Sequence, residues 1–409
     1  MGGPDRRTVL KLAAASAALA ACSPAVRVSE KHVAVIGGGI VGASIAYHLT
    51  KAGMKVTLLE RGKLAERASR GTFAWINATW AKQPRAYHAF NQDGLLGWHR
   101  LQRDLGIPVR WGGSLEWFET DTRQARLAEQ IAEQVDWGEP AEMIGPEALR
   151  ELEGKVDFTG VEQAAYSPND GAVDPVLATE MLVAAAIELG AAVQENCSVE
   201  RVAPNANGRS VLQTQRGDLV VDKFVLATGA DPEATARLAG IDIPQRSTPG
   251  VIVVTTPQPR LINRIIVAPG VHIHQRDDGR IVLGEQDGAP DTAAHMERLR
   301  DRPNRFPAQV FADQHAMRIL SIAEQYVPGM LDADVEDVFI GWRPLPLDGH
   351  PVLGTSPANP TAYLAIMHSG VSLAPIVGEV VAQEISTGVA ADVLAPYRPN
   401  RDFAEVRRY

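Results

Sequence analysis

A glycine pattern at residues 37–42 constrains the fold of this chain more than any other feature of its sequence. The apolar run His32–Ile36 predicts a buried strand, Ile40–Lys51 has the apolar spacing of a helix, and residues 55–60 predict a second strand. Strand, glycine pattern, helix and strand follow one another within about 30 residues, the length of one β-α-β unit. We therefore expect an α/β chain that begins with a nucleotide-binding unit.

The spacing of the glycines matches G-x-G-x-x-G, which is typical of dinucleotide-binding sites. Gly37 permits a tight turn, Gly39 lets the backbone approach a pyrophosphate, and Gly42 lets helix and strand pack closely. The N-terminus of the following helix favours the phosphates. Glu60 ends the second strand 18 residues after Gly42, where its carboxylate can accept hydrogen bonds from both ribose hydroxyls. The motif alone does not separate NAD from FAD.

Composition and charge exclude several classes of protein. The chain has 409 residues, which predicts two or three domains, and its 45% hydrophobic and 22% charged residues are globular values. A formal net charge of −9 argues against a nucleic-acid binder. Two cysteines cannot form a disulfide framework, and no Cys/His cluster has zinc-ligand spacing, so we expect no metal site.

The first residues indicate a targeting segment. Arg6-Arg7 precedes an apolar stretch at residues 12–21, a pattern that resembles a twin-arginine export signal. Leu19-Ala20-Ala21-Cys22 resembles a bacterial lipobox, in which the cysteine carries the lipid. We expect a signal peptide at residues 1–21, a tether at residues 22–31, and export to a lipid anchor at the periplasmic or extracytoplasmic face of the membrane. The alternatives are an export signal with an incidental cysteine, or a tail without a targeting role.

The remainder of the chain alternates helical and extended patterns. Apolar spacing predicts helices at residues 84–106, 122–153, 175–189, 308–326 and 373–386. Strands are predicted at residues 193–202, 211–214, 224–227, 338–340 and 363–367. Within a strand-rich stretch at 251–285, Asp278-Gly279 predicts a hairpin turn between strands at 272–276 and 280–284. This mixed order indicates domains whose segments interleave.

Four further motifs follow the glycine pattern along the chain. They are Gly171-Ala172-Val173-Asp174-Pro175, then Ala227-Thr228-Gly229, then the run from Arg343-Pro344 through Asp348-Gly349-His350-Pro351 to Gly354, and finally His368-Ser369-Gly370 before a helix. With these motifs the sequence resembles the D-amino-acid oxidase superfamily of FAD enzymes, in particular its glycine oxidases and D-amino-acid dehydrogenases. The resemblance extends over about residues 32–388.

The resemblance implies FAD as the cofactor and an α/β fold of two interleaved domains. A Rossmann-like FAD-binding domain is expected from residues 32–83, 155–245 and 335–409. A substrate domain of sheet plus helices is expected from residues 84–154 and 246–334. The residues expected to bind FAD are Gly37, Gly39, Ile40, Val41, Gly42, Glu60, Arg61, Ala68, Ser69, Val199, Gly229, Ser369, Gly370, Val371 and Ser372.

Arg343 is the residue to which the resemblance gives the most specific role, because the family's arginine at this position anchors the substrate carboxylate. A planar guanidinium suits that task, since it binds a carboxylate bidentately. The alternative is a structural ion pair, with Asp348 or another acid. His272 is expected beside the substrate and alternates with His274 on one strand face; packed core histidines and an H-x-H metal pair are the alternatives. His368 either borders the substrate or caps its loop.

Two departures from relatives bear on the chemistry. Gly341 stands where some amine oxidases of the superfamily attach flavin to a cysteine, so we expect noncovalent FAD; Ala374 stands where sarcosine-type relatives have a lysine. The expected reaction is oxidation of a small amine, a D-amino acid or a glycine-like amino acid, by hydride transfer to flavin N5 and hydrolysis of the imine. Either O₂ or a membrane quinone accepts the electrons. The alternatives are oxidation of a 2-hydroxy acid or polyol, and a lipid-anchored binding module without catalysis.

Overall fold

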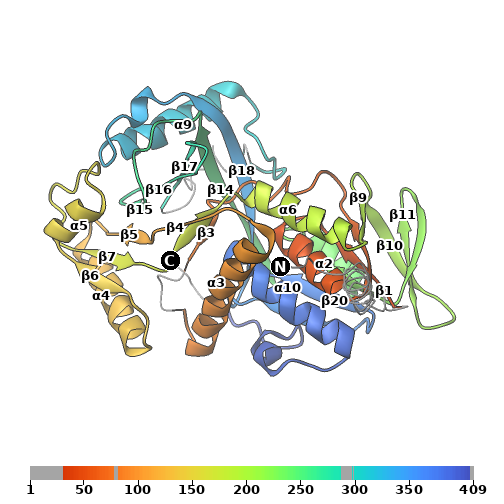
Figure 1. Ribbon diagram of the computed structural model, residues 1–409. Helices are drawn as coiled ribbons and strands as arrows, with labels where there is room; N and C mark the ends of the chain where they lie inside the picture. The colour runs from red at the N-terminus through yellow and green to blue at the C-terminus, as the bar shows by residue number, and fades with distance from the viewer. Residues whose placement is uncertain (1–30, 78–81, 287–296, 298, 406–409) are drawn as a thin grey trace, which may run out of the picture.

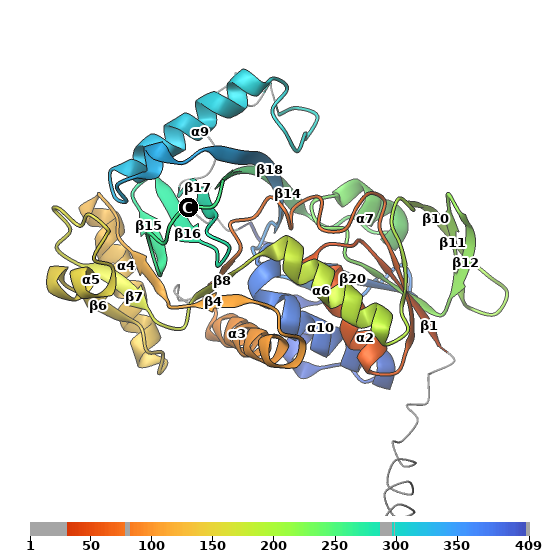
Figure 2. The same ribbon diagram turned by 45° about the horizontal axis from the view of Figure 1, so that its top comes forward.

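The computed structural model describes residues 31–77, 82–286, 297 and 299–405. Two large sheets, of six and eight strands, organise these residues, and each sheet has its own buried core (Figures 1 and 2). A small sheet of β3 (Trp75–Ile76), β8 (Gly171–Val173) and β4 (Val109–Trp111) lies between them. The predicted α/β fold class is confirmed.

The six-stranded sheet is built around the predicted β-α-β unit. Its order is β19-β20-β13-β1-β2-β9, and all neighbouring strands are parallel except β19 and β20. The strands, in this order, are Val352–Thr355, Ala362–Ile366, Lys223–Leu226, His32–Ile36, Lys55–Leu59 and Ala192–Gln194. The central strands are buried on both faces, as expected of parallel strands covered on both sides.

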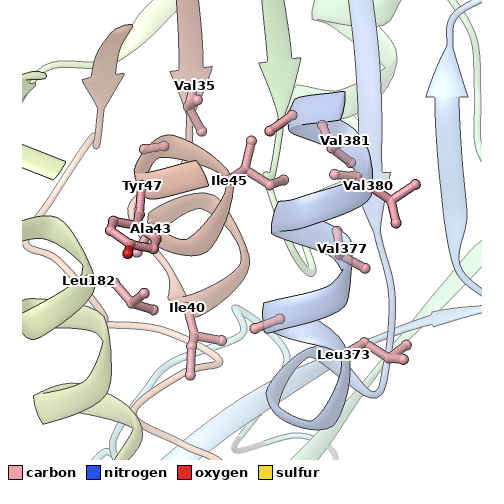
Figure 3. Close-up of a cluster of buried hydrophobic side chains, with 14 of the residues drawn as sticks. Val35, Ile40, Ala43, Ile45, Tyr47, Leu182, Leu373, Val377, Val380 and Val381 are labelled. Carbon is pink, nitrogen blue, oxygen red and sulfur yellow. The ribbon is translucent and has the colours of Figure 1, made fainter. Parts of the chain in front are cut away.

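Alternate residues of β1 pack in two different hydrophobic cores. Val33 and Val35 face the layer of α2 (Ile40–Lys51), α6 (Pro175–Glu188), α10 (Gly370–Thr387) and α3 (Arg85–Leu105). Figure 3 shows α2 between Leu182 of α6 and Val377 of α10. Ala34 and Ile36 face the other side, where α7 (Pro232–Ala239) packs with a sheet of β10 (Val199–Pro204), β11 (Ser210–Thr214) and β12 (Gly217–Val221).

The eight-stranded sheet is mixed and carries the second core. Its order is β18-β14-β17-β16-β15-β5-β7-β6, and α9 (Gln309–Glu324) packs on it. The strands, in this order, are Val335–Pro346, Gln245–Thr255, Ile281–Gly284, Val271–Gln275, Ile265–Ala268, Ser114–Glu116, Ala164–Ser167 and Glu142–Ile144. The long β14–β18 ladder pairs Thr248 with Arg343, which carries that arginine beyond the core of this sheet.

Several predicted elements are confirmed to within about two residues, the usual uncertainty of helix ends. They include the first β-α-β unit, the helices now assigned as α3, α6 and α9, and the hairpin of β16 and β17. In the hairpin, Gly279 has φ +90°, and the Arg276 N–H donates to the Arg280 carbonyl at 2.8 Å. A glycine was needed there because other residues rarely adopt such a φ.

The single helix predicted at residues 122–153 is wrong. The structure has α4 (Asp121–Asp136), then β6, then α5 (Pro146–Leu152). Gly138, with φ +91°, follows the end of α4, and Pro146 takes the first turn of α5, where its missing N–H costs nothing. The apolar spacing continues across these breaks, so spacing alone joined two helices and a strand.

Two other predicted boundaries also change. The strand predicted at 193–202 divides at Asn196, where φ is +51°, so that β9 and β10 belong to different sheets. The last helix begins at Gly370 rather than at 373. Pro375 cannot donate to the Val371 carbonyl, and the Trp98 indole donates to it instead at 2.8 Å. That side-chain bond satisfies the carbonyl that Pro375 leaves without a backbone donor, so α10 can contain this proline.

Residues 1–30 lie outside the described part of the chain, and with them the predicted signal peptide, Cys22 and nearly all of the predicted tether. Among the described residues, no helix is long and apolar enough to cross a membrane. The domain boundaries drawn from the sequence stay a prediction. The six-stranded sheet takes its strands from residues 32–59, 192–226 and 352–366, and the eight-stranded sheet from 114–167, 245–284 and 335–346.

Candidate active site

One cavity of about 1880 Å³ extends from the glycine motif to the eight-stranded sheet. Sites for small molecules and cofactors usually have about 300–1000 Å³, so this cavity is large enough for a dinucleotide and a second ligand. The structure brings to its wall every residue predicted for cofactor or substrate: Gly37, Gly39, Ile40, Val41, Gly42, Glu60, Arg61, Ala68, Ser69, Val199, Gly229, His272, Arg343, His368, Ser369, Gly370, Val371 and Ser372. Of the site residues predicted from the sequence, only the lipidation candidate Cys22 lies outside the described residues.

The glycine motif leaves no room for side chains at two of its three positions. Gly37 has φ +111°, and a Cβ there would lie 2.3 Å from the Ala227 carbonyl oxygen. A Cβ at Gly42 would lie 1.9 Å from the Gly37 carbonyl oxygen. At Gly39 a Cβ would meet only the Ser69 hydroxyl, at 3.0 Å, so this position keeps the backbone open to the cavity. These are the separate roles expected of the three glycines.

Glu60 orders the loops around the motif with both of its carboxylate oxygens. One accepts a hydrogen bond from the Gly38 N–H at 2.7 Å and the other from the Gly62 N–H at 2.8 Å. Each carboxylate oxygen has a further lone pair for a ribose hydroxyl. Ser69, whose hydroxyl accepts from the Ile40 N–H at 3.0 Å, fixes the first turn of α2 beside the same cavity.

A salt bridge between Arg61 and Asp231 forms part of the cavity wall near the glycine motif. Arg61 lies 2.6 Å from Asp231, and the same carboxylate caps α7 by accepting from the Ala234 N–H at 2.9 Å. Sequence reasoning singled out Arg61 and missed Asp231, although an aspartate immediately before Pro232 is a typical helix N-cap. Val199 at the start of β10 and Gly229 after β13 complete this part of the wall.

The N-terminus of α10 points at the middle of the cavity. Ser369 is its N-cap residue but makes no side-chain capping bond, and Gly370, Val371 and Ser372 line the cavity. The Ser372 hydroxyl accepts from the Asn77 N–H at 3.1 Å and donates to the Trp75 carbonyl at 3.3 Å. Unsatisfied N–H groups and the helix dipole together favour a ligand with partial negative charge at this position.

Arg343 is half-buried in the wall that β18 and β14 form. Its Nη2 donates to the Pro249 carbonyl at 2.9 Å, and its Nε would lie 3.3 Å from a Cβ at Gly250. The alternative of an ion pair with Asp348 does not describe this structure. Asp348 instead binds Arg401, at 2.6 and 3.0 Å. The glycine at 250 therefore leaves the space that the Arg343 guanidinium occupies.

His272 and His274 face the same side of β16, as predicted, but their surroundings differ. Both rings pack against Phe73, with centroids 5.4 and 4.8 Å away. His272 lines the cavity, whereas His274 is buried and bonds the Phe73 carbonyl through Nε2 at 2.9 Å. Burial lowers the pKa of His274 to about 3, so its ring is neutral. Among the described residues no group of three or more His, Cys, Asp or Glu is placed to hold a metal.

Trp75 is a wall residue that the sequence analysis missed. Its indole N–H donates to the buried carboxylate of Asp170 at 2.7 Å, and its ring meets His272 edge-on at 5.9 Å. Ser114 donates to the same Asp170 oxygen at 2.8 Å. The hydrogen bond to Asp170 fixes the orientation of the Trp75 indole, and the Trp75 side chain lines the cavity. No spacing in the sequence links these residues, which the small sheet brings together.

Gly341 packs directly against another backbone segment. A Cβ at Gly341 would lie 2.0 Å from the Gly71 carbonyl oxygen, and a Cβ at Gly71 would lie 2.3 Å from the Gly341 Cα. The loop after α2 and β2 therefore rests on β18 through two glycines. A cysteine side chain at position 341 does not fit this packing without a shift of one backbone.

The sequence matches a family described as DAO, FAD dependent oxidoreductase, over residues 32–384. This chain belongs to that family. Its cofactor is therefore FAD, and it is an FAD-dependent oxidoreductase. The match includes the glycine motif, Arg343 and the start of α10, the three parts of the cavity wall described above.

Curated relatives and solved structures agree with this assignment. The chain is 26% identical to an opine oxidase subunit of Agrobacterium tumefaciens (strain Ach5), covering 92% of this chain and 99% of the relative. It is also 26% identical to glycine oxidase of Geobacillus kaustophilus (strain HTA426), covering 91% and 98%. The crystal structure of glycine oxidase from Geobacillus kaustophilus superposes with a TM-score of 0.78 at 23% identity, over 91% and 99% of the two chains. L-proline dehydrogenase from P. horikoshii gives 0.77 at 24% identity, over 91% and 97%.

Proposed function

We propose that this protein oxidises the carbon–nitrogen bond at the α-carbon of an amino acid, of D configuration or glycine-like, and that Arg343 binds the substrate carboxylate. The observation that carries the proposal is the shared cavity. The glycine motif, the N-terminus of α10 and Arg343 all line it, so a cofactor and a carboxylate substrate can be held in contact. The relatives named as glycine oxidase and opine oxidase support an amine as the substrate.

The cavity fits FAD in three respects. Gly39 keeps its backbone open to the cavity, the Glu60 carboxylate would accept hydrogen bonds from the ribose, and the N-terminus of α10 lines the same cavity where the flavin would bind. When bound, FAD supplies a two-electron acceptor. We infer noncovalent binding, because Gly341 has no side chain to attach and no room for one. Acid precipitation should leave the yellow cofactor in the supernatant; colour that stays with the pellet would contradict this inference.

The protein's own contribution to the reaction is orientation and exclusion of water. Arg343 offers a planar fork for the carboxylate, and a substrate held by that fork has its α-carbon fixed. Trp75 and His272 pack edge-on in the wall of the same cavity, and their rings would help to exclude water from the amine of a bound substrate. Loss of a hydride from the α-carbon and of a proton from nitrogen leaves an imine. Water then hydrolyses the imine to an oxo acid and ammonia or an amine.

Anaerobic mixing of the purified holoprotein with candidate substrates tests the proposal. D-amino acids, glycine, N-methyl amino acids and 2-hydroxy acids are each added under argon, and the visible absorbance of the flavin is followed. Bleaching by amino acids supports the proposal. Bleaching by hydroxy acids alone would replace it with oxidation of an alcohol.

We also propose that the protein is exported by the twin-arginine route and held at the membrane by a lipid on Cys22, with either O₂ or a membrane quinone as electron acceptor. The support is the pattern Arg6-Arg7 with Leu19-Ala20-Ala21-Cys22. A diacylated cysteine binds membranes stably, whereas one acyl chain binds only marginally. Cys22→Ala should release the protein from the membrane fraction, and an unprocessed soluble precursor in native cells would contradict the localisation.

The electron acceptor can be separated from the anchor by comparing lipidated enzyme in membranes with O₂ or a soluble quinone. Peroxide formed in step with substrate loss, without quinone reduction, identifies an oxidase. Quinone reduction without peroxide identifies a dehydrogenase.

A further inference from the structure

One face of helix α4 (Asp121–Asp136) forms part of the cavity wall on the substrate side. Arg123, Arg126, Leu127 and Gln130 line the cavity, and their spacing of three, four and seven residues places them along a single stripe of the helix. Leu127 is buried and anchors the stripe, while the polar side chains extend from it. Helix α4 packs on β6 and β7 of the eight-stranded sheet, so its arginines line the cavity from the side of that sheet.

The position of this face is fixed from two sides. The Arg123 guanidinium lies over the Phe118 ring, 4.1 Å from its centroid, which holds the charged group in one plane. Further along α4, Glu133 accepts from the Gln83 side chain at 2.5 Å, and Gln83 also lines the cavity. These two contacts tie α4 to the segment before α3 and fix Arg123 against Phe118 in the cavity wall.

The charge of this face contrasts with that of the whole protein. The chain has a formal net charge of −9, which repels anions in general. Within the described part of the chain no carboxylate lies within 4 Å of Arg126, whereas Arg61 at the cofactor end is bound by Asp231. Lys82 also lines the cavity near this face. A local cationic surface on an acidic protein raises the concentration of anions at that place.

We propose that the α4 arginines, Arg123 and Arg126, bind a second carboxylate of the substrate, so that the preferred substrates are amino acids with two carboxylates. This inference rests on the proposed function, because Arg343 is taken to bind the first carboxylate. The second carboxylate is carried either by the side chain or by a substituent on the nitrogen. Both kinds of molecule present the same anion to α4, and the bond that is oxidised stays the carbon–nitrogen bond at the α-carbon.

The test compares matched ligands on the FAD-loaded enzyme and on an Arg123→Gln/Arg126→Gln double variant. Glutarate and butyrate, which differ by one carboxylate and cannot be oxidised as amines, are titrated while the flavin spectrum is monitored. We expect the dissociation constant of glutarate to rise on the order of tenfold in the double variant, and that of butyrate to change less than about twofold. Arg150→Gln on α5, exposed and outside the cavity, is the matched control and should change neither.

A second arm uses substrates, with D-glutamate for a side-chain carboxylate, iminodiacetate for a carboxylate on nitrogen, and glycine for neither. The double variant should raise the KM of at least one dicarboxylate on the order of tenfold and leave glycine nearly unchanged. The arm that responds identifies which carboxylate reaches α4. High salt should weaken the dicarboxylate preference of the wild type, because exposed charges are screened.

Equal losses for glutarate and butyrate, or no change for either, would overturn the second-carboxylate site. That failure is distinct from failure of the proposed function. If no amino acid bleaches the flavin of the wild type, the amine oxidation itself is wrong. If glycine bleaches it and α4 has no selective effect, only the inference about α4 is wrong.

Discussion

At the end of the cavity that holds the glycine motif, the wall comes from one continuous stretch, residues 37–69, and from two shorter ones, residues 197–200 and 227–238. At the end that holds Arg343, the wall comes from β3, β14, β16, β18, α4 and α10, which are distant in the sequence. The first end depends on backbone groups and on the absence of side chains, whereas the second depends on particular side chains at fixed angles. A change at the first end should therefore affect FAD binding and stability, and a change at the second should affect substrate binding alone.

Gly42→Ala should have the largest effect, because it acts on the backbone of the cofactor end. The new Cβ would lie 1.9 Å from the Gly37 carbonyl oxygen, and backbone cannot move aside cheaply. We expect a loss of about 3 kcal/mol in the free energy of unfolding, the upper part of the usual range for overpacking. Chemical denaturation and the FAD content of the purified protein measure it. Gly145→Ala is the control, since nothing lies within 4 Å of its Cβ; equal losses in both variants would contradict the close-packing argument.

Glu60→Ala should weaken FAD binding by about 2–3 kcal/mol, because it removes hydrogen bonds to a charged group at the ribose position and leaves two loop N–H groups unsatisfied. Dialysis against FAD-free buffer, followed by the flavin spectrum, measures the loss. Substrate binding to the fraction that keeps FAD should be unchanged. A variant that retains FAD as well as the wild type would show that Glu60 serves the loops only.

Arg343→Lys should affect the other end of the cavity. Lysine keeps the charge but loses the bidentate fork, so substrate affinity should fall at least about tenfold, or about 1.4 kcal/mol. FAD content and thermal stability should stay near those of the wild type. Steady-state kinetics with the substrate found in the anaerobic screen provide the measurement, and unchanged turnover in Arg343→Ala would remove the arginine from the substrate site.

A smaller effect concerns pH and compares one buried histidine from each region. Burial lowers the pKa of His48 on α2 and of His274 on β16 to about 3. An unfolded histidine has a pKa of about 6.5, so the unfolded chain takes up protons as the pH falls below that value and the folded chain does not. Each histidine should thus lower the free energy of unfolding by about 1 kcal/mol between about pH 6.5 and 5.5, with a further loss at lower pH and little effect above about pH 7.5.

Denaturation curves at several pH values, for the wild type and His274→Gln, check this sign. The variant should lose less stability than the wild type as the pH falls. A steeper loss in the variant would mean that His274 is protonated in the folded protein.

The sequence predicted the cofactor end because the information there is local. Gly37, Gly42 and Glu60 carry their roles in their spacing, and the strands and helix around them follow from apolar periodicity. Arg343 was predicted from a motif, but its contact with Pro249 depends on the β14–β18 ladder, which no spacing shows. Trp75 was missed because its partner Asp170 is 95 residues away.

The misplaced boundaries have similar physical reasons. The helix α10 can start before Pro375 because the Trp98 indole donates to the Val371 carbonyl in place of the N–H that Pro375 lacks. Trp98 lies 273 residues before Val371 in the sequence. The false helix at 122–153 came from apolar spacing that continues through β6, and it hid the stripe of α4 that faces the cavity. Contacts between residues distant in the sequence determine where these helices and strands begin and end. The apolar spacing along the chain does not show such contacts.

The most direct test is a crystal structure of the FAD-loaded protein with butyrate, a carboxylate that cannot be oxidised as an amine. We predict FAD phosphates at the glycine motif and two Arg343 nitrogens within about 3 Å of the butyrate oxygens, the distance of charge-assisted hydrogen bonds. Butyrate bound away from Arg343, with that guanidinium still bonded to the Pro249 carbonyl, would contradict this prediction.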